Sequence, residues 1–213
     1  MEQIIQLNSG AKLSPNLASP SEAALSNLSE LNCVRLSPHF TLGEFTKSGS
    51  HPEVYNIPSH EAIANLKRLC GWLEVLRERY NESIHPAPNP APHMGGEYTI
   101  PSTPLLMGGG GGGGGDKARL QPIIINSGYR SPQLNKKIGG APTSNHLTGC
   151  AADIRVSGME QAIRYAAILL DYSRESNQDF DELLIEKNRY GAIWVHFAVR
   201  PSNNRRKILF INA

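Results

Sequence analysis

Two segments of the chain place their apolar residues at helical spacing. The first, residues 57–80, carries them at Ile63, Leu66, Leu69, Cys70, Leu73, Leu76 and Tyr80. The second, residues 159–176, carries them at Ala162, Tyr165, Ala166, Leu169 and Leu170. Steps of three and four residues gather these side chains on one face of an α-helix. The pattern therefore predicts two amphipathic helices that pack on a core.

Short apolar runs bounded by turn residues fill the second half of the chain. Such runs are typical of buried strands. Four strands are expected within residues 121–130, 149–156, 180–187 and 192–199, and residues 205–213 are expected to add an edge strand. Helices come first and short strands cluster late, which predicts the α+β class.

The amino-terminal segment shows only weak periodicity. Residues 1–36 are rich in Ser, Asn, Ala and Leu, and we expect a loosely structured leader with a short helix around residues 21–31. A single domain is expected over residues 37–213. Near its start, Thr41 and Glu44 have the three-residue spacing of a capping box, which predicts the beginning of a helix.

Residues 81–119 interrupt this domain. They contain closely spaced prolines and the eight consecutive glycines Gly108–Gly115. Proline lacks a backbone donor and polyglycine has a large entropy cost of ordering. We therefore expect a flexible insertion without a core of its own. Its histidines, His85 and His93, would bind a metal only adventitiously.

Composition and charge narrow the classes of function. Of the 213 residues, 39% are hydrophobic and 19% are charged, and the formal net charge is +2. So small an excess does not indicate a nucleic acid or a membrane surface as partner. No apolar run has the roughly 18–20 residues that a membrane span needs. We expect a monomer that binds no nucleic acid.

The start of the chain and its cysteines bear on the compartment. The segment MEQIIQLNSGAKLS lacks the basic and apolar regions of a signal peptide, so cytoplasmic synthesis is expected. Cys33, Cys70 and Cys150 lie far apart and form no CxxC pair. An odd, scattered set argues against disulfides and against a thiolate metal site. Free buried thiols are the expectation.

Three polar residues raise a question of chemistry. Asp153 lies inside the apolar run AADIRV, His196 lies inside WVHFAV, and His146 precedes Asp153 by seven residues. A charged side chain that is buried without a partner is costly. A metal ion, an arginine or a set of amides would each compensate it. A catalytic zinc ion takes three ligands of the His, Asp or Glu type, which these residues would supply.

The surrounding motifs resemble those of the zinc D-Ala-D-Ala carboxypeptidases and related peptidoglycan endopeptidases of metallopeptidase family fifteen. The stretches that carry the resemblance are SGYR, the Leu-Asn pair after it, GG, SNHLTGCAAD and WVH, with HFTLGEFTKS upstream. The resemblance covers about residues 39–80 and 120–210, and it leaves out the leader and the insertion. It implies a hedgehog/DD-peptidase-like zinc fold, in which helices pack on a small antiparallel sheet.

The resemblance also implies roles for individual residues. His146, Asp153 and His196 would be the ligands of a Zn²⁺ ion. Arg130, in SGYR, would act in catalysis by binding a carboxylate or carbonyl of the substrate, because a guanidinium can form two parallel hydrogen bonds with a carboxylate. Ser144 would orient the loop or a bound group through its hydroxyl.

The general base is where the sequence departs from the family pattern. Relatives place an acidic residue or a histidine shortly before the last zinc-binding histidine, whereas here Trp194 and Val195 precede His196 and cannot transfer a proton. The nearest carboxylate is Glu186, ten residues upstream. In a hairpin of adjacent strands, Glu186 could still lie across from His196. Glu186 is therefore the predicted base and Asp181 the next candidate, and the alternative is that Glu186 is only a surface charge.

Two functions are consistent with these residues. The first is zinc-dependent hydrolysis of peptide bonds in peptidoglycan stem peptides, by a carboxypeptidase or an endopeptidase. The lack of a signal peptide favours a phage or prophage lysin that acts on the cell wall. The alternative is a non-catalytic cell-wall-binding or virion structural module that keeps the fold, which the displaced base and the insertion favour.

Overall fold

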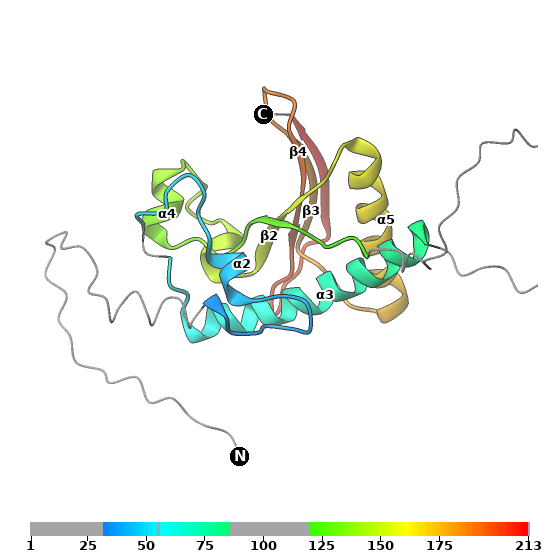
Figure 1. Cartoon of the computed structure of the whole chain (residues 1–213), viewed down its shortest axis with the longest axis horizontal. Helices are drawn as coiled ribbons and strands as arrows, with labels where there is room; N and C mark the ends of the chain where they lie inside the picture. The colour runs from blue at the N-terminus through cyan, green and yellow to red at the C-terminus, as the bar shows by residue number, and fades with distance from the viewer. Residues whose placement is uncertain (1–31, 55, 86–119, 213) are drawn as a thin grey trace, which may run out of the picture.

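The computed structural model describes residues 32–54, 56–85 and 120–212. Its helical segments are α2 (Leu42–Thr46), α3 (His60–Ile84), α4 (Pro132–Lys137), the 3-10 helix η1 (Asn145–Thr148) and α5 (Met159–Ser176). Its strands are β1 (Ile125–Ser127), β2 (Ala151–Arg155), β3 (Glu182–Lys187), β4 (Ile193–Ala198) and β5 (Lys207–Asn212). Figure 1 shows the sheet at the centre, with α5 on one side and α4 on the other.

The strands form one sheet in the order β1-β2-β4-β3-β5. Neighbouring strands are antiparallel except β3 and β5, which are parallel. The predicted α+β class, with helices packed on a small sheet, is confirmed, although the sheet is mixed rather than wholly antiparallel. The order of the chain explains the difference. Because β3 already lies beside β4, the returning chain passes β3 and pairs with its outer edge, in the direction of β3.

One face of the sheet belongs to the core. Its side chains pack against α3 and α5 in a single apolar cluster. The strands contribute Ala152, Ile154, Leu183, Ile185, Val195 and Phe197 to this cluster. The ring of Phe197 lies 5.3 Å from that of Trp72 on α3, measured between centroids. The helical and strand periodicities of the sequence therefore meet in one core.

The opposite face of the sheet carries polar residues. Side chains alternate between the faces along a strand, so Glu182 and Glu186 share this face of β3. Asp153 of β2 is the direct cross-strand partner of His196 of β4, and His196 is in turn opposite Leu184 of β3. Four polar side chains from three adjacent strands are thereby brought to one surface.

Helix α3 is longer than expected. Its N-cap is Ser59, whose hydroxyl oxygen accepts the N–H of Ala62, and the helix continues past the predicted segment to Ile84. The buried Asn81 side chain accepts the N–H of Gln121 at 2.6 Å and donates to its carbonyl at 3.0 Å. The helix therefore runs a few residues into the segment predicted to be an insertion, and Asn81 joins α3 to Gln121.

The beginning of the domain is also earlier than expected. The predicted capping box is present at α2, where the Glu44 carboxylate accepts hydrogen bonds from the N–H and the hydroxyl of Thr41, both at 2.9 Å. Leu36 is already part of the core, so the packed structure starts before residue 37. The short helix expected around residues 21–31 lies outside the described residues.

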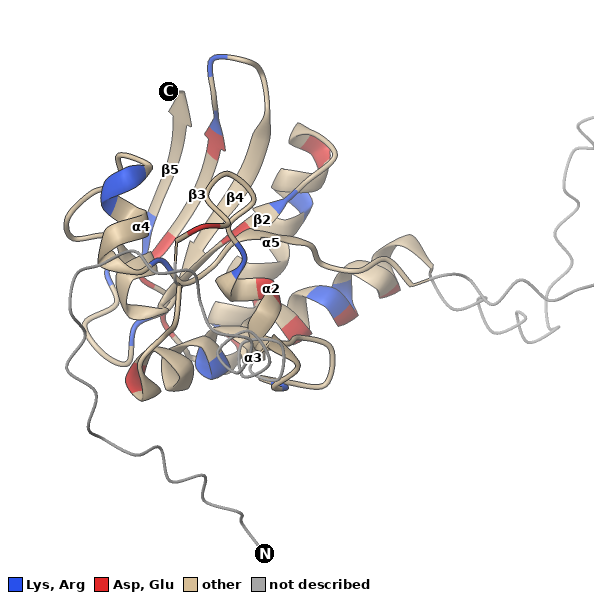
Figure 2. Cartoon of the chain, turned by 60° about the vertical axis from the view of Figure 1, so that its left-hand side comes forward, with Lys and Arg blue, Asp and Glu red and all other residues tan. Residues whose placement is uncertain are grey.

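The remaining whole-chain expectations concern charge and thiols. Figure 2 shows acidic and basic positions interspersed over the described elements. Within the described ranges, no helix is long and apolar enough to cross a membrane. Cys70 and Cys150 are free and buried, as expected, whereas Cys33 is free but exposed.

Candidate metal centre

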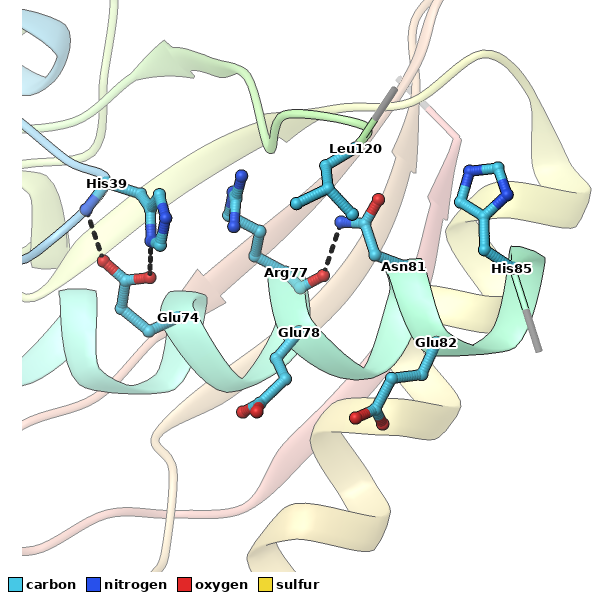
Figure 3. Close-up of a pocket in the computed structure, with 8 residues that line it drawn as sticks. All are labelled: His39, Glu74, Arg77, Glu78, Asn81, Glu82, His85 and Leu120. Carbon is cyan, nitrogen blue, oxygen red and sulfur yellow. Dashed lines mark hydrogen bonds and ion pairs between the residues drawn. The ribbon is translucent and has the colours of Figure 1, made fainter. Parts of the chain in front are cut away.

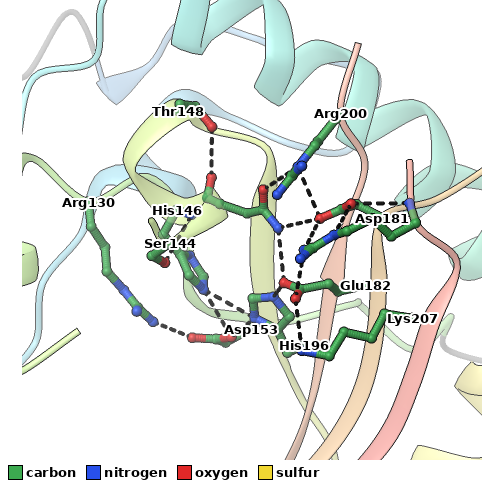
Figure 4. A network of polar contacts seen from close by, with 12 residues as sticks. Arg130, Ser144, His146, Thr148, Asp153, Asp181, Glu182, His196, Arg200 and Lys207 are labelled. Carbon is green, nitrogen blue, oxygen red and sulfur yellow. Dashed lines mark hydrogen bonds and ion pairs between the residues drawn. The ribbon is translucent and has the colours of Figure 1, made fainter. Parts of the chain in front are cut away.

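Three buried side chains from different elements converge on one point (Figure 4). The distances are 3.2 Å between His146 Nε2 and Asp153 Oδ1, 2.9 Å between Asp153 Oδ1 and His196 Nδ1, and 3.3 Å between the two histidine nitrogens. Ligand atoms about 2.0–2.2 Å from a tetrahedral zinc ion lie roughly 3.3–3.6 Å apart. The three donor atoms are close to this spacing, slightly on the short side, and among the described residues they form a group that could hold a metal.

The loop that presents His146 is shaped by its two ends. The hydroxyl oxygen of Ser144 caps η1 by accepting the N–H of His146 at 3.3 Å. Gly149 ends η1 with a left-handed φ of 70°, and a Cβ at this position would lie 2.5 Å from the Ala62 carbonyl oxygen on α3. Glycine meets both demands without strain. The hydroxyl of Ser144 thus contacts the backbone of the loop that it is predicted to orient.

The SGYR stretch orients the ring of His146. The carbonyl of Gly128 lies 2.6 Å from His146 Nδ1, which leaves Nε2 to face Asp153. The N–H of Arg130 also donates to the carbonyl of His146 at 3.0 Å. A Cβ on Gly128 would lie 2.7 Å from Phe45, so glycine permits the close approach to α2. The motif therefore holds the side chain of a candidate metal ligand from another part of the sequence.

Asp153 is paired with Arg130. Nη2 of the arginine donates to Asp153 Oδ2 at 2.5 Å, and its Nε donates to Ser127 Oγ at 2.9 Å. Asp153 Oδ1 is left to face the two histidines. The sequence predicts that Arg130 binds substrate, and the structure places its guanidinium beside a candidate metal ligand.

Burial and neighbouring charges shift the pKa values of the three residues. Burial lowers the pKa of His146. Burial opposes ionisation of Asp153, but the charges and hydrogen bonds of the two histidines outweigh it and hold the pKa of Asp153 well below its usual range. Burial also acts against the charged form of His196, yet hydrogen bonds to Asp153 and Glu182 raise its pKa to about 9. His196 must therefore lose a proton before it binds a metal.

Glu186 lies on the same face of the sheet as Asp153 and His196, but it is not directly opposite His196. The register pairs Glu186 with Trp194 and His196 with Leu184. The prediction of a direct pair is wrong because the loop between the strands spans only residues 188–192. Glu186 is instead a diagonal neighbour of His196, which is still close enough to interact. Burial raises the pKa of Glu186.

Asp181, the other candidate base, is fully buried and bound to other groups. Arg205 donates to its two oxygens at 2.8 and 2.6 Å, and Asn145 Nδ2 donates at 2.7 Å. Arg200 Nε lies 3.1 Å away. Burial opposes ionisation, but these partners outweigh it and lower the pKa of Asp181. A carboxylate held in this way is a poor proton acceptor, so the geometry favours Glu186.

Sequence reasoning missed a polar network beside His196. Its members are Asn145, Glu182, Arg200 and Arg205, which contact one another and Asp181 (Figure 4). One signal was available for Glu182, because it alternates with Glu186 along a buried strand and so shares its face. The two arginines follow the last motif in a loop, where no sequence pattern indicates their partners.

A separate pocket of about 440 Å³ lies along α3 (Figure 3). It is lined by His39, Glu74, Arg77, Glu78, Asn81, Glu82, His85 and Leu120. Nδ1 of His39 lies within hydrogen-bonding distance of Glu74 Oε2, at 2.7 Å. In the described part of the chain, no group of three converging metal-ligand side chains includes His85. His93 lies outside the described residues.

One protein-family model matches part of the chain. Residues 117–187 match the sequence model of the family described as Peptidase M15. The matched segment contains His146, Asp153 and Glu186 and ends before His196. A search of curated proteins gives no significant match.

Proposed function

From the Peptidase M15 family domain that this chain contains at residues 117–187, we propose that the protein is a zinc-dependent peptidase that cleaves peptide bonds of bacterial peptidoglycan. The observation that carries the proposal is the spacing of three buried ligand atoms, 2.9–3.3 Å from one another. A peptidase family implies a peptide substrate, and the resemblance of the motifs to peptidoglycan carboxypeptidases and endopeptidases narrows that substrate to stem peptides.

The metal and one carboxylate divide the chemistry. A zinc ion held by His146, Asp153 and His196 would supply the Lewis acidity that polarises a scissile carbonyl and activates water. Glu186 is the proposed general base, which takes a proton on its carboxylate and delivers it to the leaving amine. Its place on the same face as His196 and its raised pKa support this role. A base works best when its pKa lies near the working pH.

Arg130 and Ser144 are proposed to position the substrate. The contacts of the Arg130 side chain use Nε and Nη2, so its Nη1 remains to donate to a carbonyl or carboxylate oxygen of the substrate. The hydroxyl of Ser144 accepts the N–H of His146 and keeps its own proton to donate. Both residues would thus bind substrate without releasing the groups that they hold in the described structure.

Purified protein loaded with zinc tests the activity on defined peptidoglycan fragments. Release of D-alanine from pentapeptide fragments identifies a carboxypeptidase, and conversion of cross-linked dimers to monomers identifies an endopeptidase. Mass spectrometry distinguishes the products, and removal of the metal with a chelator should abolish cleavage until zinc is restored. A zinc-loaded protein that binds the cell wall but cleaves none of these fragments would instead support the non-catalytic module.

Action on the intact cell wall as a phage or prophage lysin belongs to the same proposal. A suspension of purified sacculi should then lose turbidity when the zinc-loaded protein is added, since cutting cross-links dissolves the network. Cleavage of soluble fragments without any effect on sacculi would oppose the lysin role and leave the peptidase role in place.

A further inference from the structure

His196 uses both nitrogens of its ring. Nδ1 faces the candidate metal centre, 2.9 Å from Asp153 Oδ1 and 3.3 Å from His146 Nε2. Nε2, on the far side of the ring, lies 3.4 Å from Glu182 Oε2. A neutral imidazole offers one nitrogen as a donor and the other as an acceptor. An ionised carboxylate can accept hydrogen bonds but cannot donate one. Glu182 therefore favours the tautomer of His196 that has its proton on Nε2 and its lone pair on Nδ1.

Glu182 is itself held in place. Its Oε2 accepts a hydrogen bond from Asn145 Nδ2 at 2.9 Å, and its Oε1 lies 2.9 Å from Arg205 Nη2 and 3.5 Å from Lys207 Nζ. These contacts arrive from η1, from the loop after β4 and from β5. The side chain is 14% exposed. A carboxylate with partners on both oxygens has little freedom to move, which suits it to orient a neighbouring ring.

The fold explains why Glu182 can act on two ligands at once. It lies two residues before Leu184, the direct partner of His196, and therefore on the same face of the sheet. Its other partner, Asn145, is the residue before His146 in η1. One carboxylate thus links the strand that carries the last ligand to the loop that carries the first.

The arrangement separates Glu182 from the role of general base. It contacts the nitrogen of His196 that faces away from the ligand cluster, and it is paired with Arg205 and Lys207. Glu186, further along the same face, has neither feature in the described contacts. The two carboxylates of β3 therefore divide into one that orients a ligand and one that faces the site.

We propose that Glu182 is a positioning residue that directs Nδ1 of His196 to the metal by accepting the proton of Nε2. Hydrogen-bonded carboxylates commonly fix the tautomer and the orientation of metal-binding histidines. This inference rests on the proposed function only in assuming that the cluster binds zinc. It requires no particular substrate and no turnover.

Two variants of similar size test the hydrogen bond. Glu182→Met removes the acceptor at nearly the same length, whereas Glu182→Gln keeps one acceptor oxygen. Zn²⁺ affinity of the full-length protein is measured by competition with a chromophoric chelator. Loss of an outer hydrogen-bond partner typically weakens metal binding about 10–100-fold, so we expect this loss for Glu182→Met and near wild-type affinity for Glu182→Gln. Asp179→Asn, which removes a carboxylate paired with Arg206 outside the site, should leave the affinity unchanged.

Which nitrogen binds the metal is a second readout. In protein loaded with ¹¹³Cd and labelled with ¹⁵N-histidine, the coupling of the metal should appear at Nδ1 of His196 and at Nε2 of His146. Coupling at Nε2 of His196 in the wild type overturns the inference, and this holds even if Glu182→Met does not fold. Equal affinity of Glu182→Met and the wild type also overturns it.

The outcomes separate this inference from the proposed function. A protein that binds zinc with the expected nitrogens but cleaves no peptide supports the role of Glu182 and contradicts the peptidase. If the wild type cleaves peptides and Glu182→Met binds zinc as tightly as the wild type, the peptidase is supported and the role of Glu182 is contradicted. A wild type that binds no zinc overturns both.

Discussion

Asp153, His146 and His196 show how burial defines the chemistry available to a residue. An ionised aspartate in an apolar strand is costly unless partners compensate it, and here Arg130 binds one oxygen while two histidines face the other. Each histidine has a partner on its second nitrogen, the Gly128 carbonyl for one and Glu182 for the other. The remaining donor atoms point to one centre, which is what a metal site requires.

Glu186→Gln tests the proposed base. Glutamine keeps the shape and a hydrogen bond but cannot take a proton, so turnover should fall by about two to four orders of magnitude. Zinc affinity should barely change, because Glu186 is not a ligand. Steady-state kinetics on peptidoglycan fragments and a chelator competition measure the two quantities.

His196→Ala is the contrasting variant, since it should lose metal and activity together. An active Glu186→Gln protein beside an inactive, folded Asp181→Asn protein would mean that Asp181 is the base. If neither substitution affects turnover, the general base is not one of these two carboxylates and lies elsewhere in the chain.

Asp181→Asn also tests the contribution of a buried charge to stability. The pKa of Asp181 lies below its ordinary value of 3.8 in the folded protein, so its ionised form stabilises the fold above that pH and this stability is lost as the pH falls through the folded pKa. At about pH 6 the variant should be less stable by about 2–3 kcal/mol, the usual worth of hydrogen bonds to a charged group. The difference should shrink as the pH falls below 3.8. Urea unfolding at several pH values measures it, and a difference that does not vary with pH would contradict the assignment.

At the scale of elements, strand β3 and loop η1 place side chains that the motifs do not connect. Alternation puts Glu182 and Glu186 on one face, at opposite ends of the strand, and the short loop after β3 sets which residue of β4 each one meets. In η1 the capping residue Ser144 and the left-handed Gly149 determine where His146 points. The residues at the ends of these elements therefore determine the geometry of the site as much as the candidate ligands do.

Gly149→Ala tests this control. Alanine in the left-handed region costs about 1–2 kcal/mol, and a Cβ only 2.5 Å from the Ala62 carbonyl oxygen adds strain. We expect a loss of at least about 1–2 kcal/mol in the free energy of unfolding and weaker zinc binding, because the loop that carries His146 must shift. Urea unfolding and chelator competition measure both effects.

Gly71→Ala is a matched control for that substitution. Gly71 lies inside α3, and a Cβ there would meet nothing within 4 Å. Alanine should therefore stabilise the helix by roughly 0.5–1 kcal/mol and leave zinc affinity unchanged. Equal effects of the two glycine substitutions would show that the turn at Gly149 has no special role.

At the scale of the whole molecule, the sheet separates a packed apolar face from a polar face that carries the candidate metal centre. Helices α3 and α5 cover the apolar face, and the loops around η1 and β1 border the polar one. The two flanks of residues 86–119 meet where the Asn81 side chain forms hydrogen bonds with both backbone groups of Gln121. The end of α3 and the segment that leads to β1 are thus joined directly by hydrogen bonds within the described residues.

Replacement of residues 86–119 by a short Gly/Ser linker should leave the domain intact. Loop-closure entropy changes by only about 0.6 kcal/mol for each twofold change in length, so a roughly fourfold shortening should stabilise the protein by about 1 kcal/mol. Zinc affinity should be unchanged. Thermal unfolding and chelator competition measure the effects. A large loss of stability would mean that the segment packs against the domain. Asn81→Ala removes the hydrogen bonds to Gln121 and should destabilise the full-length and the shortened protein by the same amount.

The sequence alone determined the features that depend on near neighbours along the chain. Periodicity predicted α3, α5 and the strands, because an amphipathic pattern is a local property of a helix or strand. The candidate ligand group His146, Asp153 and His196 could also be predicted, since polar residues inside apolar strands need partners and the motifs resemble a known family. The capping box of Thr41 and Glu44 was visible for the same local reason.

Only the tertiary structure decided what depends on distant parts of the chain. The loop at residues 188–192 set the register that puts Leu184, not Glu186, opposite His196. Folding also brought Arg130 to Asp153, and Arg205 and Asn145 to Glu182. These pairs are far apart in sequence, and a charged residue carries no local mark of the partner it will meet. Strand register and the different partners of Glu182 and Glu186 arise from packing, which sequence patterns do not encode residue by residue.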